Sequence, residues 1–267
     1  MRCAVLGSPI VHSLSPAMHR AAYAALGLDW SYGAFDVAEG ELREFVSERR
    51  EGWRGYSVTA PLKREAAALA VTRDADTQAL GVANTLVAQD GGWAAANTDV
   101  PGAINALRGI GVESLSTVRI VGAGATAASV ALAAHRLGAS QVELRVRDTA
   151  RAAATARVVE QLGLTTTIVP LHVDVIQSVD LLVSTVPGAG IAGHEHAYVG
   201  AAEAVFDVVY DPWPSDLMRS ARADGTALVT GLDLLAHQAV LQVDLMTGRQ
   251  VDPQVLLDAA TEALASR

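Results

Sequence analysis

A glycine-rich turn between an apolar segment and a helical one constrains this 267-residue chain more than any other feature. Residues 118–121 (Val-Arg-Ile-Val) predict a buried strand, residues 122–127 read Gly-Ala-Gly-Ala-Thr-Ala, and residues 129–137 predict a helix of small side chains. Strand, G-x-G-x-x-A turn and helix in this order form the fingerprint of a dinucleotide-binding fold, whereas a purely structural tight turn is the alternative. The glycines let the backbone approach a pyrophosphate, whose charge is met by free N–H groups at the helix start. The predicted cofactor contacts are Gly122, Ala123, Gly124, Ala125 and Thr126.

The identity of the dinucleotide depends on the residues that follow the next predicted strand, residues 141–146. At this place an acidic residue favours the free 2′-hydroxyl of NAD, and arginines favour the 2′-phosphate of NADP. Arg147 and Arg151 favour NADP, whereas Asp148 favours NAD. Two guanidinium groups can hold a dianionic phosphate, and Asp148 can instead cap the following helix. We therefore predict NADP as the cofactor, with NAD as the alternative.

Lys63 is the only lysine of the chain, and it follows residues 57–62 (Ser-Val-Thr-Ala-Pro-Leu) where a predicted strand gives way to a helix. Open α/β sheets bind ligands at such strand ends. Arginine cannot release its proton near neutrality but an amine can, so a proton-transfer site has reason to keep lysine here. The alternative is a solvated lysine at a helix start.

Two further groups of polar residues suit a small polar substrate. Asp99 and Asn84 each adjoin a threonine at the edge of an apolar run. Alone, Asp99 could cap a helix over residues 100–108, but beside Lys63 it would orient the amine for reversible carbonyl reduction. Ser15 before a proline predicts the N-cap of a helix, whereas Ser13 has no such role. Both hydroxyls could bind one polyhydroxylated or anionic ligand.

Composition excludes several classes of partner. Hydrophobic residues make up 51% of the chain and charged residues 18%, which is typical of a folded protein. A net charge of −9 argues against nucleic acid or an anionic membrane surface as a partner. The chain lacks a run of about 18 apolar residues, so we expect a cytoplasmic protein. Cys3 is the sole cysteine, and residues 194–196 (His-Glu-His) lack further ligands, so we predict neither an internal disulfide nor a metal.

Several short motifs resemble the shikimate dehydrogenase family over almost the whole chain. They are Ser13-Leu14-Ser15-Pro16, Val58-Thr59 with Pro61 and Lys63, Asn84-Thr85-Leu86, Asn97-Thr98-Asp99, the Gly122 turn, Tyr210, and Gly231 to Gln238. The resemblance implies NADPH-dependent, reversible reduction of 3-dehydroshikimate to shikimate in aromatic amino-acid biosynthesis. It implies that Lys63 and Asp99 are the acid–base pair and that Val208 and Gly231 also contact the cofactor. The substrate contacts that it implies, together with this pair, are Ser13, Ser15, Ser57, Thr59, Asn84, Tyr210 and Gln238.

The resemblance also implies an α/β fold with two domains and a cleft between them. An α/β substrate domain would comprise residues 1–101, completed by C-terminal helices in 232–267, and a Rossmann-type doubly wound parallel sheet would occupy 102–231. Ser57 stands where many members have Asn, which leaves quinate or an amino-substituted analogue as an alternative substrate. A non-catalytic NADP-binding sensor is a third alternative, although a sensor does not need Lys63 with Asp99. The choice between monomer and homodimer stays open, because no coiled-coil pattern decides it.

Overall fold

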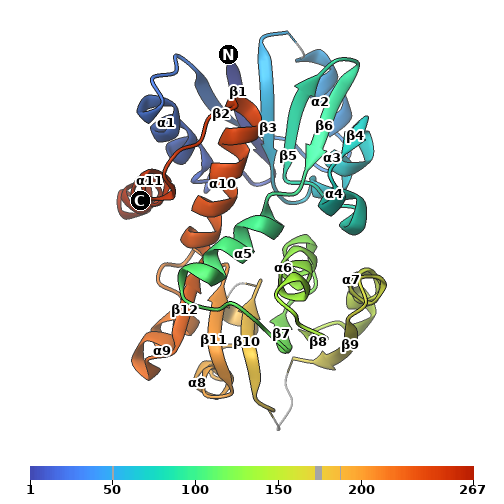
Figure 1. The fold of residues 1–267 in the computed structure, drawn as a ribbon, viewed down its shortest axis with the longest axis vertical. Helices are drawn as coiled ribbons and strands as arrows, with labels where there is room; N and C mark the ends of the chain where they lie inside the picture. The colour runs from blue at the N-terminus through green and yellow to red at the C-terminus, as the bar shows by residue number, and fades with distance from the viewer. Residues whose placement is uncertain (50, 172–175, 187) are drawn as a thin grey trace. The chain divides into compact units, whose positions relative to one another are not determined.

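The computed structural model describes residues 1–49, 51–171, 176–186 and 188–267, apart from the side chains of residues 151 and 189. The chain divides into two compact units, whose elements are labelled in Figure 1. Unit 1 comprises Met1–Gly102 and Leu235–Arg267, and unit 2 comprises Ala103–Leu234. Helices α5 (Asp99–Gly109) and α10 (Gly231–Thr247) contain the residues at which the chain leaves and re-enters unit 1.

Unit 1 is built on a mixed sheet in the order β2-β1-β3-β5-β6-β4. Strand β1 pairs parallel with β2 and β3, whereas β5 pairs antiparallel with both β3 and β6. The strands are β1 (Arg2–Gly7), β2 (Ser31–Asp36), β3 (Trp53–Val58), β4 (Thr72–Arg73), β5 (Thr85–Gln89) and β6 (Gly92–Ala96). The other helices of this unit are α1 (Ser15–Ala25), α2 (Leu42–Glu48), α3 (Lys63–Leu69), α4 (Ala75–Leu80) and α11 (Pro253–Ala265).

Strand β1 is buried on both faces, which explains why its sequence is an apolar run rather than an alternation. Successive side chains of a strand point to opposite faces. Ala4 and Leu6 pack in one cluster with residues of α2 and α3, and Cys3 and Val5 pack in another with residues of α1, β2 and α10. Helices therefore pack on both faces of β1.

Unit 2 contains a wholly parallel sheet in the order β12-β11-β10-β7-β8-β9. This order, read from the other edge, is the 3-2-1-4-5-6 arrangement of doubly wound dinucleotide-binding folds, as predicted. The strands are β7 (Thr117–Val121), β8 (Gln141–Val146), β9 (Thr165–Pro170), β10 (Val179–Ser184), β11 (Ala202–Asp207) and β12 (Ala227–Thr230). The connecting helices are α6 (Ala125–Arg136), α7 (Thr149–Gln161), α8 (Glu195–Val199) and α9 (Asp216–Asp224), with a short 3₁₀ turn at Gly188–Gly190.

The N-cap predicted at Ser15 is wrong. Helix α1 begins at Ser15 itself, Leu14 holds the N-cap position, and no side chain at that position caps the helix. Leu14 already has a helical backbone conformation, with φ −88° and ψ −11°, so Ser15 falls inside the first turn and not before it. The Ser13 hydroxyl accepts a hydrogen bond from the Ser15 backbone N–H at 3.3 Å and thereby satisfies one donor of the first turn.

Two predictions about the first βαβ segment of unit 2 have different outcomes. Helix α6 begins at Ala125 rather than at residue 129, because Gly124 takes the extended N-cap conformation directly after the turn. Asp148 does cap the next helix, because its Oδ1 accepts a hydrogen bond from the Ala150 N–H at 3.0 Å. The structure thus gives Asp148 a local role that is independent of any cofactor.

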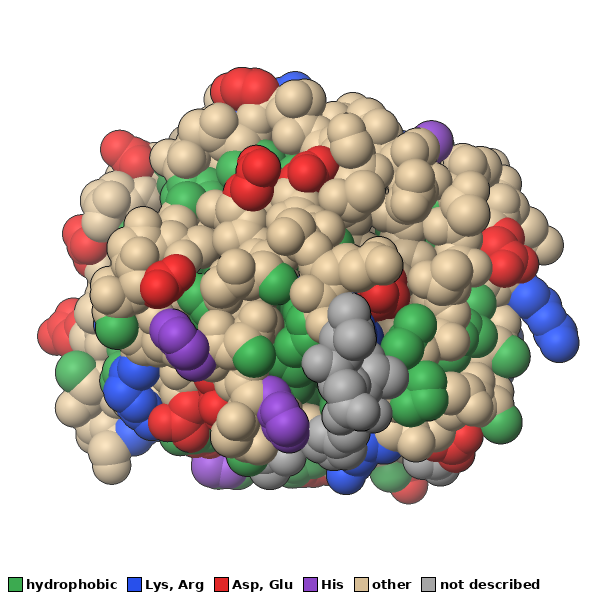
Figure 2. Space-filling model, turned by 90° about the horizontal axis from the view of Figure 1, so that it is seen from below, with side chains coloured by type: hydrophobic (Ala, Val, Ile, Leu, Met, Phe, Trp, Pro, Cys, Tyr) green, Lys and Arg blue, Asp and Glu red, His purple; other side chains and the backbone are tan. Residues whose placement is uncertain are grey.

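The surface agrees with the acidic composition. On the face drawn in Figure 2, Asp and Glu side chains are scattered among uncharged ones, and the Lys and Arg side chains lie in separate places near its margin. Within the described ranges, none of the helices is both long and apolar enough to cross a bilayer.

Candidate active site

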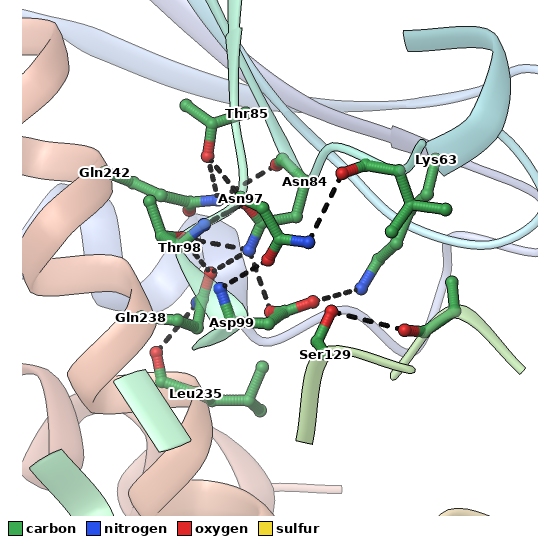
Figure 3. Close-up of polar contacts among 12 residues, drawn as sticks. Lys63, Asn84, Thr85, Asn97, Thr98, Asp99, Ser129, Leu235, Gln238 and Gln242 are labelled. Atoms are coloured by element: carbon green, nitrogen blue, oxygen red, sulfur yellow. Dashed lines mark hydrogen bonds and ion pairs between the residues drawn. The ribbon is translucent and has the colours of Figure 1, made fainter. Parts of the chain in front are cut away.

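An ion pair between Lys63 and Asp99 lies in unit 1. Lys63 is the first residue of α3, shortly after β3 ends, and Asp99 is the first residue of α5. Lys63 Nζ lies 2.6 Å from Asp99 Oδ2, and the two side chains are 13% and 8% exposed (Figure 3). The pair is therefore largely screened from water but still accessible, as a proton-transfer site requires.

Asn84 holds the other side of the Asp99 carboxylate. Its amide Nδ2 donates to Asp99 Oδ1 at 2.8 Å and lies 3.2 Å from Gln238 Oε1. Its Oδ1 accepts hydrogen bonds from the Thr98 backbone N–H and the Thr85 hydroxyl, both at 2.9 Å. Because each Asp99 oxygen has its own partner, the carboxylate is fixed in orientation (Figure 3).

The antiparallel pairing of β5 with β6 brings these residues together, although they are distant in the sequence. The Asn84 N–H donates to the Ala96 carbonyl oxygen at 3.1 Å, at the end of the ladder. Asn97 then accepts the Asp99 N–H at its Oδ1 and donates its Nδ2 to the Val82 carbonyl oxygen. The short polar motifs at 84–86 and 97–99 are thus the two ends of one hairpin.

The remaining sequence-predicted residues of unit 1 differ in whether they make contact with the Asn84 cluster. Gln238, on α10, joins the Asn84 cluster and donates its Nε2 to the Leu235 carbonyl oxygen at 2.8 Å. Ser57, at 4% exposure, donates to Gln242 Oε1 at 2.7 Å. Ser13 and Thr59 are half-buried, and within the described part of the chain neither has a hydrogen bond to the Asn84 cluster.

A buried histidine supports the backbone at Ser15. His19 is fully buried, and burial lowers its pKa to about 4, so the ring is neutral near neutral pH. Its Nδ1 lies 2.9 Å from the Ser15 carbonyl oxygen and must therefore be the protonated nitrogen that donates. The ring also stacks on Tyr32, with centroids 4.1 Å apart.

Sequence reasoning missed Gln242 and Tyr32. Gln242 is 1% exposed and donates Nε2 to both the Asn84 carbonyl oxygen and the Thr85 hydroxyl at 3.0 Å. The one sequence signal for it is its position four residues after Gln238, which places both amides on one face of a helix. Tyr32 donates its hydroxyl to Ser57 at 2.5 Å, and the sequence pattern carries no signal for this contact.

In unit 2, Tyr210 lies on the loop that follows β11. The Asp207 carboxylate bridges the two ends of this loop. It accepts a hydrogen bond from the Val209 N–H at 3.2 Å and another from the Ser215 hydroxyl. Burial raises the pKa of Asp207. The contact of Tyr210 with a substrate stays a prediction.

The glycine turn after β7 opens into a cavity of about 470 Å³. It lies at the carboxyl ends of β7 and β8, beside the point where the strand order reverses, which is where doubly wound sheets bind ligands. Predicted cofactor residues Gly122, Ala123, Arg147 and Asp148 line it. Arg151 lies in α7, and its side chain lies outside the described part of the chain.

Close approaches within the chain explain two of the three glycines predicted to contact the cofactor, Gly122 and Gly231. Gly122 has φ +110°, and a Cβ there would overlap the Thr185 hydroxyl and lie 2.9 Å from Val186 Cγ1. A Cβ on Gly231 would lie 2.8 Å from the carbonyl carbon of Val208, so these two predicted residues are in contact. Bare backbone at Gly122, unpaired N–H groups in the first turn of α6 and the Arg147 guanidinium suit a pyrophosphate and a 2′-phosphate, so the residues present fit NADP.

A buried charge cluster forms part of the wall of this cavity. Glu143 binds Arg119 Nε at 2.6 Å and Arg145 Nε at 2.5 Å, and Arg145 lines the cavity. Burial alone would raise the pKa of Glu143, but the hydrogen bonds from the two arginines outweigh burial and lower it. Glu143 thus holds Arg145 rigidly at the wall.

Known proteins share this architecture. A family model described as the shikimate dehydrogenase substrate binding domain matches residues 5–86. The shikimate dehydrogenase (NADP(+)) of a Thermus thermophilus strain is 36% identical, over 99% of this chain and 99% of the relative. The crystal structure of Mycobacterium tuberculosis shikimate dehydrogenase is 33% identical with a TM-score of 0.89, over 98% of this chain and 99% of that one. A crystal structure of shikimate 5-dehydrogenase from Thermus thermophilus, in complex with NADP(H) and shikimate, is 34% identical with a TM-score of 0.84, over 98% and 99% of the two chains. The similarity therefore extends over both units.

Proposed function

This chain belongs to the shikimate dehydrogenase family, and from that premise we propose that Lys63 and Asp99 carry out its proton transfer. The protein is an NADP-dependent oxidoreductase that interconverts 3-dehydroshikimate and shikimate, a step of aromatic amino-acid biosynthesis. The observation that supports the residue roles best is the 2.6 Å ion pair between Lys63 Nζ and Asp99 Oδ2.

When bound, the nicotinamide supplies the hydride that reduces the ketone carbon. The Lys63 ammonium donates a proton to the oxygen of that ketone as negative charge develops on it, and takes the proton back in the reverse direction. Asp99 accepts a hydrogen bond from Lys63 at one oxygen and from Asn84 at the other, so it holds the ammonium in line with the substrate. Proton transfer of this kind contributes about 10²–10⁴-fold to the rate.

Unit 1 would bind the substrate and unit 2 the cofactor. The substrate-binding family model covers residues 5–86, which lie in unit 1, and the glycine turn at Gly122 lies in unit 2. In this proposal the polar side chains of unit 1 hold the hydroxyls and the carboxylate of shikimate. Those side chains are Ser13, Ser15, Thr59, Asn84 and Gln238. The cytoplasmic location and the choice between monomer and homodimer stay predictions from the sequence.

The direct test is the initial rate of shikimate oxidation with NADP⁺, followed by the absorbance of the reduced nicotinamide. We expect rapid turnover of shikimate with NADP⁺ and slower rates in parallel reactions with quinate or with NAD⁺. Quinate is the informative competitor, because the Ser57 hydroxyl already donates its hydrogen to Gln242. A folded protein that binds NADP but turns over none of these substrates would be a sensor rather than an enzyme.

Arg147 should decide the preference for NADP. Arg147→Ala removes the exposed guanidinium that lines the cavity. Hydrogen bonds to charged groups contribute about 1.5–3 kcal/mol, so we expect the KM for NADP⁺ to rise roughly 10- to 100-fold and that for NAD⁺ to change little. Arg157→Ala, an exposed arginine of α7 that does not line the cavity, is the matched control. An equal rise in KM for both cofactors would contradict a role at the 2′-phosphate.

A further inference from the structure

A buried hydrogen-bonded network joins the main chain at Asn84 to β2, β3 and α10. Its members are Tyr32, Ser57, Thr85 and Gln242, whose exposures are 2%, 4%, 0% and 1%. Buried polar side chains of this kind are stable only when their hydrogen bonds are satisfied, and each is satisfied here by another member or by Asn84. The whole network lies within unit 1.

The direction of every bond in this network follows from Gln242. Its side chain lies 3.0 Å from the Asn84 carbonyl oxygen, which can only accept, so that nitrogen must be the donor Nε2. Nε2 also donates to the Thr85 hydroxyl at 3.0 Å, which uses its second hydrogen. Oε1 of Gln242 therefore faces Ser57 and accepts its hydroxyl hydrogen at 2.7 Å.

Tyr32 completes the network from the other side. Its hydroxyl lies 2.5 Å from Ser57 Oγ, and burial raises the pKa of Tyr32, so the hydroxyl keeps its proton and donates it. Ser57 accordingly accepts from Tyr32 and donates to Gln242. The orientation of the Gln242 amide is therefore fixed, because Ser57 donates to its oxygen and its nitrogen donates to Asn84 and Thr85.

The network continues to the proposed catalytic pair. Thr85 accepts from Gln242, so its own hydrogen is available for Asn84 Oδ1 at 2.9 Å. With Oδ1 of Asn84 occupied as an acceptor, its Nδ2 faces Asp99 Oδ1 at 2.8 Å. Figure 3 shows Gln242, Thr85, Asn84 and Asp99 in this succession.

We propose that Gln242 is a positioning residue for the reaction: it holds the main chain at Asn84 and the Thr85 hydroxyl, and through them orients Asp99. Ser57 serves this network by fixing the Gln242 amide. The inference rests on the proposed roles of Lys63 and Asp99. It assigns to α10 a second functional amide, one turn beyond Gln238.

The test compares three variants with the wild-type enzyme in shikimate oxidation. Gln242→Met keeps the length of the side chain but removes all its hydrogen bonds, and we expect kcat to fall about tenfold or more, since small displacements of a catalytic group can cost up to about 10²-fold. The KM for NADP⁺ should stay unchanged. Ser57→Ala, which removes only the hydroxyl that fixes the amide, should lower kcat by a smaller factor. In the double variant the two losses should not multiply, because the residues act as one unit.

Val243→Ala is the matched control, because Val243 is the next residue of α10 and is fully buried. It should lower the melting temperature by creating a cavity while leaving kcat near the wild-type value. Retention of kcat within twofold in Gln242→Met would overturn the inference, as would an equal loss of kcat in Val243→Ala. If Gln242→Met does not fold, an unchanged kcat in Ser57→Ala overturns it. An inactive wild-type protein would instead overturn the proposed function on which the inference rests.

Discussion

Lys63→Ala should lower kcat for shikimate oxidation by about 10²–10⁴-fold, the contribution typical of a positioned general acid–base group. The structure provides the reason, since Lys63 Nζ is held 2.6 Å from Asp99 Oδ2 with its side chain 13% exposed. In the oxidation that is measured, removing the amine leaves the shikimate hydroxyl without the base that takes its proton as the ketone forms. The KM for shikimate should change little, because the loss falls on the transition state.

Arg64→Ala is the control for this variant. Arg64 is the neighbouring cation in the same helical turn and is exposed, so its removal should leave kcat near the wild-type value. Both variants are to be compared by steady-state kinetics and thermal unfolding. A loss in Lys63→Ala that appears only in the KM for shikimate would make Lys63 a binding residue rather than the proton donor.

Asp99→Asn should have the second largest effect, with kcat lower by roughly 10²-fold, the cost of a misplaced catalytic group. The substitution keeps the shape of the side chain and an oxygen for Asn84, but it removes the negative charge that orients the Lys63 ammonium. The melting temperature should also fall, because breaking a largely buried pair leaves a charge without its partner.

The double variant Lys63→Ala with Asp99→Asn separates a common role from two independent ones. If both residues serve one proton transfer, the double variant should be no slower than the slower single variant. Losses of kcat that multiply would show that Asp99 acts on something other than Lys63. Rates are to be measured at saturating shikimate and NADP⁺, so that only kcat is compared.

The local motifs of unit 2 are those that the sequence predicts best. An apolar strand, a glycine turn and a small-residue helix have one common arrangement, and the structure has it at β7, Gly122 and α6. The first and last residues of a helix are less predictable: α6 begins at Ala125, directly after the turn, and not at residue 129 as predicted. The N-cap predicted at Ser15 was wrong as well, because the chain already has a helical backbone conformation at Leu14.

The identity of the candidate proton donor was also available in the sequence, because a single lysine after a strand is a local and chemically distinctive feature. The contacts of Asp99 and Asn84 needed the β5–β6 pairing, which joins positions that the sequence separates. The role of Gln242 could not be predicted from its spacing alone, because a glutamine on an apolar helix has the same pattern whether its amide meets solvent or a buried main chain.

The sequence by itself therefore determined the class of fold, the cofactor turn at Gly122 and the candidate lysine, because each depends on neighbouring residues and on backbone geometry. Only the tertiary structure decided which partners surround that lysine. Hydrogen-bond partners such as Ser57 and Gln242 are set by how β3 and α10 pack, and packing brings together residues from distant parts of the chain. Interactions between neighbouring residues determine which helices and strands form, and the packing of those elements determines which side chains meet in the site.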